Sequence, residues 1–200
     1  MGLRGRSERF EYSAALFHSR TEDEIVVAAN EGGRSTYANA EESRRQGVEL
    51  ALAGELAPDW HFATAYTYLD AEYADDFALC GAPPCAVDDL IIQGGRNIPG
   101  LAKHFAWGQL RWSPLADTDV MLEGRFSDRV WVNDDNTESA PAYASFDLAA
   151  ERRFRWAGLE WRGFARINNL FDRDVIGSVI VNEGNGRYYE PAPGRNWMIG

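Results

Sequence analysis

The stretch Gly158–Asn168 reads GLEWRGFARIN, and it decides the fold class because its side chains alternate between two kinds. Its apolar and small residues fall on one face, at Leu159, Trp161, Gly163, Ala165 and Ile167. The other face carries the charged and polar residues Glu160, Arg162, Arg166 and Asn168. Phe164 is the one apolar residue on that face. A period of two predicts a β-strand, and about ten residues suffice for a tilted strand to cross a bilayer.

The same alternation recurs along the chain and predicts an antiparallel β-protein. It is clear in residues 46–56, 119–127 and 142–153, and more mixed in residues 10–20, 60–71 and 103–113. Residues 197–200 supply an eighth, incomplete strand. The 12% of aromatic residues also favours β structure.

The connections between these strands alternate in length. Short connections are expected at residues 57–59, 114–118 and 155–158, a middling one at 133–141, and long ones at 21–44, 73–101 and 171–193. Short turns on one side and long loops on the other are typical of an outer-membrane β-barrel. In that arrangement the short turns face the periplasm and the long loops face outward.

A soluble antiparallel barrel or sandwich also has strands of period two. Two observations favour the membrane barrel over this alternative. Loops longer than about 12–15 residues are uncommon in compact domains. The face opposite the apolar one holds several Arg and Glu, which would not normally line a soluble core.

Length and composition set further limits. The chain has 200 residues and a net charge of −11, so it is one ordinary domain or a piece of a larger one, and it lacks the basic surplus of a general nucleic-acid binder. No long apolar run predicts a transmembrane helix. The basic N-terminus is followed by charges rather than by the apolar core of a signal peptide. We therefore expect either a cytoplasmic chain or a missing true N-terminus.

Short motifs in the second half of the chain carry a family resemblance. Asn168–Arg173 resembles the NLF-D/N-x-x-Y motif of TonB-dependent outer-membrane receptors, with Val175 in place of the usual Tyr. Arg45–Leu50 is similar to the family's x-x-G-V-E-L strand start. Asn97–Gly100, followed by Lys103 and His104, is similar to its N-x-I-P-G-x-P-x-H entry. These landmarks come in the family's order and together are fairly specific.

The resemblance implies an all-β fold, an antiparallel transmembrane β-barrel segment with about 8 strands of a barrel of about 22. Residues 1–200 would be the C-terminal portion of that barrel, with the plug and the N-terminal strands absent. The expected location is the outer membrane of a Gram-negative cell.

The implied function is TonB-dependent import of a scarce nutrient, most often a ferric siderophore, with this chain forming barrel wall and external loops. The expected partners are outer-membrane lipid, the siderophore and the TonB complex, which acts through the missing plug. We expect a monomer that is not an enzyme, binds no nucleic acid and needs no cofactor. The alternatives are a small soluble or periplasmic ligand-binding β-barrel and a small self-contained membrane barrel.

Three arginines are candidate ligand-binding residues. If the apolar face meets lipid, Arg125, Arg162 and Arg166 point into the lumen, where they could contact an anionic ferric chelate or an acidic plug surface. The alternative is a polar ladder in which these arginines pair with Glu123, Glu151 and Glu160.

Cys80 and Cys85 lie five residues apart in the longest expected loop. We expect a disulfide between them if the chain is exported, because the periplasmic route is oxidising and no nearby Cys or His completes a metal site. The three His residues fall on different expected strands, so neither a catalytic triad nor a metal centre is predicted.

Overall fold

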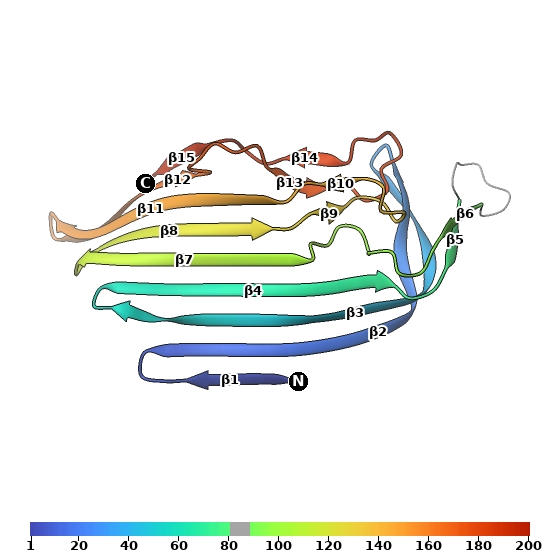
Figure 1. Ribbon diagram of the computed structural model, residues 1–200. Helices are drawn as coiled ribbons and strands as arrows, with labels where there is room; N and C mark the ends of the chain where they lie inside the picture. Colours follow the sequence, from blue (N-terminus) through green and yellow to red (C-terminus); the bar gives the residue numbers. More distant parts are fainter. Residues whose placement is uncertain (81–88) are drawn as a thin grey trace.

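The protein is described by a computed structural model over residues 1–80 and 89–200, and every regular element in these ranges is a β-strand. Nine of the strands form one sheet whose spatial order is the order of the chain. The sheet consists of β1 (Gly2–Arg6), β2 (Phe10–Glu31), β3 (Arg34–Ala57), β4 (Trp60–Tyr73), β7 (His104–Leu115), β8 (Thr118–Ser127), β11 (Tyr143–Trp156), β12 (Leu159–Asn168) and β15 (Asn196–Ile199). Neighbouring strands run antiparallel, and the sheet is open, with β1 and β15 at its two edges (Figure 1).

The eight strands predicted from the sequence are confirmed as β2, β3, β4, β7, β8, β11, β12 and β15, in the predicted order. The prediction missed β1, whose residues we interpreted only as a basic N-terminus. Leu3 is the one large apolar side chain in Gly2–Arg6, so alternation gives no signal there. Backbone pairing with β2 holds this strand, in a register that runs from Gly2 opposite Ala15 to Arg6 opposite Glu11.

Three tight turns of the sheet lie at one end, on the left in Figure 1. Strands β3 and β4 are joined by residues 58–59, β7 and β8 by residues 116–117, and β11 and β12 by residues 157–158. The left-handed backbone of Asp59 (φ 66°) and Ala157 (φ 53°) suits two-residue hairpins. The predicted short turns are therefore confirmed.

The long link predicted at residues 21–44 is wrong. Strands β2 and β3 continue through this region as a paired hairpin that ends with Glu31 opposite Arg34. The turn consists of Gly32 and Gly33, whose φ angles of 56° and 79° match a two-residue hairpin turn that few other residue types allow. The hairpin therefore extends beyond the other strands and bends over the loop end of the sheet (Figure 1).

The other connections at this end contain short strands of their own. Three two-stranded sheets pair β5 (Phe77–Leu79) with β6 (Leu90–Ile92), β9 (Val130–Trp131) with β10 (Ser139–Ala140), and β13 (Ile176–Val179) with β14 (Tyr189–Pro191). Among the residues that the structure describes, no helix is long and apolar enough to cross a membrane.

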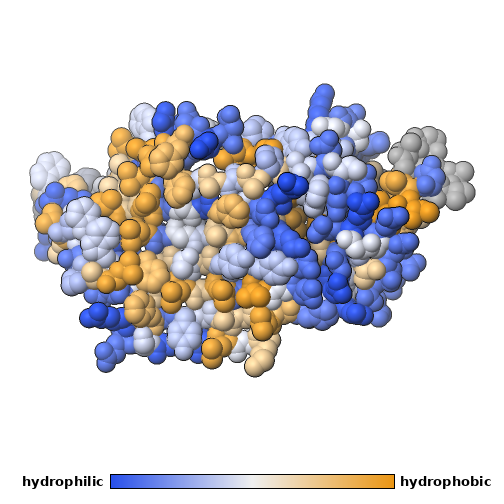
Figure 2. Space-filling model, viewed as in Figure 1, coloured by the Kyte–Doolittle hydropathy of each residue, from blue (hydrophilic) through white to orange (hydrophobic). Residues whose placement is uncertain are grey.

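The main sheet has an apolar face and a polar face. Register places large apolar side chains in rows on the first face, where many remain exposed. Examples are Tyr12, Leu16, Leu50, Leu52, Trp60, Trp112, Leu122, Phe126, Phe146, Leu148, Trp161 and Ile167. Figure 2 shows apolar patches over the strands and hydrophilic residues gathered over the loop end. So many exposed large apolar side chains on one face are typical of a membrane or protein contact.

The buried core of the described chain lies among the loops rather than against the sheet. It combines residues from the β2–β3 hairpin, the end of β4, the β5–β6 pair and the segment that follows β6: Val26, Ala40, Ala71, Tyr73, Phe77, Leu79, Ile92 and Ile98. The loops at this end are therefore packed against one another and can hold side chains in fixed positions.

Candidate ligand-binding surface

The side chain of Asn182 ties together loops that are far apart in the sequence. Its Nδ2 donates hydrogen bonds to the Val27 carbonyl oxygen at 2.7 Å and to Asp134 Oδ2 at 2.6 Å. The Asn30 amide donates to the Asn182 carbonyl oxygen at 2.8 Å. Asn182 has a φ of 52°, a conformation that asparagine tolerates better than most residues. The tip of the β2–β3 hairpin is thereby fixed to the loop before β14.

A buried tyrosine–carboxyl pair extends this network to β4. The Tyr73 hydroxyl donates to Asp134 Oδ1 at 2.6 Å, and the two residues are 1% and 2% exposed. Burial raises the pKa of the Asp134 carboxyl, against the hydrogen bonds that Tyr73 and Asn182 donate to it. Burial, followed by the neighbouring Asp134 charge, raises the pKa of the Tyr73 hydroxyl, so this group stays protonated and remains a donor.

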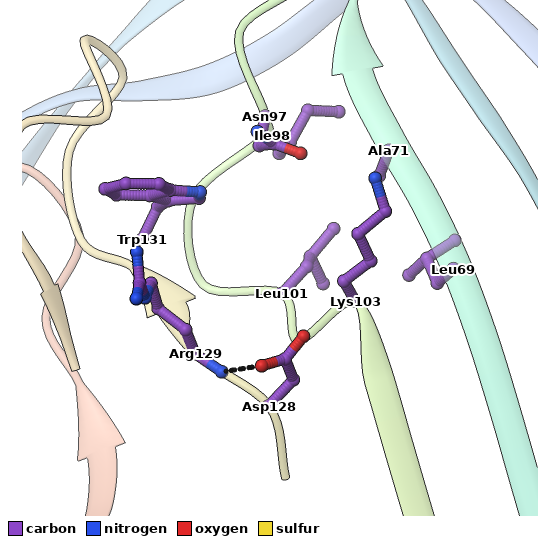
Figure 3. Close-up of a pocket in the computed structure, with 9 residues that line it drawn as sticks. All are labelled: Leu69, Ala71, Asn97, Ile98, Leu101, Lys103, Asp128, Arg129 and Trp131. Atoms are coloured by element: carbon purple, nitrogen blue, oxygen red, sulfur yellow. Dashed lines mark hydrogen bonds between the residues drawn. The ribbon is translucent and has the colours of Figure 1, made fainter. Parts of the chain in front are cut away.

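A cavity of about 240 Å³ opens beside this network, between the end of β4, the segment before β7, and β9. Its lining residues are Leu69, Ala71, Asn97, Ile98, Leu101, Lys103, Asp128, Arg129 and Trp131. Figure 3 shows Arg129 and Trp131 on one side of the cavity and Lys103 and Leu69 on the other.

The two cations of the cavity differ in their partners. Lys103 Nζ lies 2.9 Å from Asp70 Oδ1, and this hydrogen bond lowers the pKa of Asp70 and raises that of Lys103. The exposed Arg129 guanidinium lies 5.6 Å from the centre of the Trp131 ring. Within residues 1–80 and 89–200, no ion pair joins Arg129 to a carboxylate. The cavity can therefore offer an aromatic face and a charge-assisted donor to an anionic ligand.

The structure places two of the three predicted arginines in one cluster on the polar face of the sheet. Arg125 Nη2 lies 2.7 Å from Glu123 Oε1 and 3.2 Å from Asp147 Oδ2, and Arg166 Nη2 lies 2.7 Å from the same Asp147 oxygen. Arg162 stands apart and pairs with Glu151 Oε2 at 2.5 Å. The pairs with Glu123 and Glu151 match the expected ladder, whereas Glu160 pairs with Arg155 instead. Contact of these arginines with a ligand stays a prediction.

Sequence reasoning missed Asp147, the residue at the centre of this cluster. Asp147 is 8% exposed, and its Oδ1 also accepts a hydrogen bond from the Asn169 amide at 2.8 Å. Its polar-face position in the alternation of residues 142–153 was the available signal. Tyr73, Asp134 and Asn182 lay in or next to expected loops, where no periodicity marks a site.

Two other expectations concern the cysteines and metal binding. Cys80 is described, but Cys85 lies outside the described residues, so the Cys80–Cys85 disulfide stays a prediction. Among the described residues, no group of three or more His, Cys, Asp and Glu side chains is placed to hold a metal ion.

Comparison with known proteins gives a consistent result. Residues 1–170 match the family described as TonB dependent receptor-like, beta-barrel. The chain is 33% identical over 179 residues to the probable TonB-dependent siderophore receptor PiuA of Acinetobacter baumannii, covering 88% of this chain and 23% of the relative. It is 28% identical to the metal-pseudopaline receptor CntO of Pseudomonas aeruginosa, covering 95% of this chain and 23% of the relative.

The solved structures show the same likeness. The crystal structure of PiuA superimposes with a TM-score of 0.78 at 26% identity, covering 99% of this chain and 26% of that one. The ferric citrate transporter FecA superimposes with a TM-score of 0.74 at 15% identity, which shows a shared fold. The chain thus spans about a quarter of the length of the proteins that it matches.

Proposed function

The chain belongs to the TonB-dependent receptor-like β-barrel family, and from this we propose that it forms wall and external loops of an outer-membrane receptor that imports a ferric siderophore. The relatives are named as siderophore and metal receptors rather than as enzymes. The sheet is one arc of a larger barrel, completed by strands and a plug outside residues 1–200. This proposal agrees with the relatives' length and with the two open sheet edges.

The observation that carries the proposal is the two-faced sheet. One face exposes rows of large apolar side chains, and the other holds the Arg125–Asp147–Arg166 ion pairs. A wall between lipid and a water-filled lumen requires this division. The tight turns then face the periplasm, and the bent β2–β3 hairpin and the cavity face the cell exterior. The partners are outer-membrane lipid and, through the plug, the TonB complex, with the receptor acting as a monomer.

The cavity beside Trp131 is the part of the ligand site that this chain contributes. It lies at the loop end, where a ligand from outside arrives first, and its Arg129 side chain is exposed. Ferric siderophores that carry anionic or aromatic groups match a guanidinium placed next to an indole ring. The alternative function, a soluble ligand-binding barrel, would require other protein to bury the exposed apolar face.

Uptake by the whole receptor tests this function. The gene that contains this chain is expressed in a Gram-negative strain without siderophore receptors of its own, and uptake of radiolabelled ferric siderophores is measured with and without TonB. We expect the protein in the outer-membrane fraction and uptake only with TonB. A product that stays in solution without detergent, or uptake that is the same without TonB, would overturn the proposal.

A further inference from the structure

Arg152 lies on the apolar face of the sheet, near its tight-turn end. In the register of β8, β11 and β12 it stands opposite Thr118 and Gly163. Thr118 is the first residue of β8, directly after the 116–117 turn, so Arg152 is level with the edge of the neighbouring hairpin. The adjacent Arg153 points to the opposite, polar face, together with Arg162.

The position of Arg152 is unusual for its charge. Consider the part of the apolar face that runs from the tight turns to the level of the Tyr68–His104 pair. Among the described strands of the main sheet, Arg152 is the one side chain in this part that is always charged. Apart from Thr118 and Gly163, which stand directly opposite it, its neighbours on this face are apolar: Val120, Ala150, Phe154, Trp161 and Ala165.

Within the described part of the chain, no carboxylate compensates this charge. Arg152 is exposed, and the described residues offer it no ion pair. The nearest carboxylate in sequence, Glu151, lies on the opposite face and binds Arg162. An arginine facing lipid costs about 2–4 kcal/mol at the bilayer midplane and close to zero at the interface, so this side chain must reach the headgroup layer. Its long apolar stem allows the guanidinium to do so.

Aromatic side chains mark the level of the headgroups around Arg152. The β11–β12 hairpin extends past the neighbouring turn, and its apolar face there carries Phe154, Trp156 and Trp161. Trp161 Nε1 donates to the Trp156 carbonyl oxygen at 3.1 Å, which fixes the indole ring. Tryptophan gathers at membrane–water interfaces, where the phosphates of the lipids also lie.

We propose that Arg152 binds the phosphate of a phospholipid in the periplasmic leaflet, with Phe154 and Trp161 packing against the glycerol and upper acyl chain of that lipid. The guanidinium donates hydrogen bonds to the phosphate oxygens, which take the place of the carboxylate partner that the described residues do not offer. This inference rests on the proposed function, because it requires the apolar face to meet a bilayer.

The adjacent arginines provide a matched test. The full-length receptor and its Arg152→Gln and Arg153→Gln variants are purified in an uncharged detergent, and binding of short-chain phosphatidylglycerol is measured by native mass spectrometry. We expect Arg152→Gln to weaken lipid binding roughly fivefold, the effect of about 1 kcal/mol. Arg153→Gln should bind lipid like the unchanged receptor, and inorganic phosphate should not displace the lipid.

The outcomes separate this inference from the proposed function. Equal lipid binding by the two variants, or displacement by inorganic phosphate, overturns the lipid site even if the receptor transports its ligand. Arg152→Lys controls for folding, because it keeps the charge and should retain most of the lipid binding. Failure of the proposed function would appear earlier, as a receptor absent from the outer-membrane fraction.

Discussion

The Tyr73 hydroxyl donates a 2.6 Å hydrogen bond to Asp134, which joins the end of β4 to a loop 61 residues later. Tyr73→Phe removes the donor and leaves a buried carboxylate oxygen unpaired, at a cost of about 1–3 kcal/mol to the loop cluster. Hydrogen exchange of the loop amides should accelerate, while the strands of the sheet stay protected. Tyr37→Phe, on the exposed part of the β2–β3 hairpin, is the control. Unchanged exchange in Tyr73→Phe would contradict the role assigned to this bond.

The raised pKa of Asp134 predicts a pH dependence of the same loops. The folded loops bind the proton more tightly than the unfolded chain, so their stability rises as the pH falls through the raised pKa and is greatest below the ordinary value of 3.8. Glu24 acts in the opposite direction, because its hydrogen bond from Arg45 lowers its pKa below 4.5. Between neutral pH and about 4.5, we therefore expect the titration of Asp134 to determine how the stability of the loops changes with pH.

Exchange of the Val132 and Asn182 amides, both hydrogen-bonded in these loops, measures this dependence. Their protection should increase on mild acidification of the receptor. In Asp134→Asn the increase should disappear, because the titrating group is gone. The same increase in both proteins would assign the effect to another group.

The arginine cluster on the polar face predicts a stability difference between two ion pairs. Arg166→Gln removes a charged hydrogen bond to the nearly buried Asp147 and should cost about 1.5–3 kcal/mol. Arg155→Gln breaks a pair whose side chains are 80% and 77% exposed, and should cost less than about 1 kcal/mol. Thermal unfolding of the receptor in detergent compares the two variants. Equal losses would show that burial of Asp147 does not matter.

The cavity predicts a direct effect on ligand affinity. Arg129→Gln removes the exposed guanidinium beside Trp131 and should weaken binding of an anionic ferric siderophore roughly tenfold or more, as expected for loss of a charged hydrogen bond. Arg34→Gln, an exposed arginine at the hairpin tip outside the cavity lining, should bind normally. Fluorescence titration of the purified receptor with the siderophore distinguishes the variants. Equal affinities would remove Arg129 from the ligand site.

Two glycines in the sheet predict different tolerance of a methyl group. A Cβ at Gly47 would come within 2.1 Å of the Tyr68 carbonyl oxygen and 2.6 Å of the Phe17 ring, whereas a Cβ at Gly108 meets no atom closer than 3.8 Å. Gly47→Ala should therefore cost about 1–3 kcal/mol through overpacking, and Gly108→Ala should cost little. The amount of folded receptor in the outer membrane should fall for Gly47→Ala alone. Normal amounts of both would show that the strands move apart to make room.

The sequence predicted the strands of the sheet but not the structure of its loop end. Alternation identifies residues such as Leu122 and Trp161 because a sheet with two different faces imposes a period of two. The extension of β2 and β3 beyond residue 20 carries mixed side chains on both faces, so this signal is lost there. The Gly32–Gly33 pair was the remaining indication of a hairpin.

The loop network could not be predicted for a different reason. Tyr73, Asp134 and Asn182 meet through side-chain hydrogen bonds between segments that no local pattern relates. The lumen arginines were predictable in position because they lie on strands. Arg125 and Arg166 both pair with Asp147, which the sequence did not indicate, because the choice of carboxylate depends on which one the register places close by and shielded from water.

The docked β2–β3 hairpin also constrains the order in which the protein can fold. Val27 accepts its hydrogen bond from Asn182, a residue 155 positions later in the chain. Contacts of such wide sequence separation form late, because the intervening chain must first be ordered. The hairpin can form locally around Gly32 and Gly33, but it can dock at the loop end of the sheet only after the segment that contains Asn182 is in place. Docking of the hairpin would therefore report that all strands from β2 to β13 have been placed.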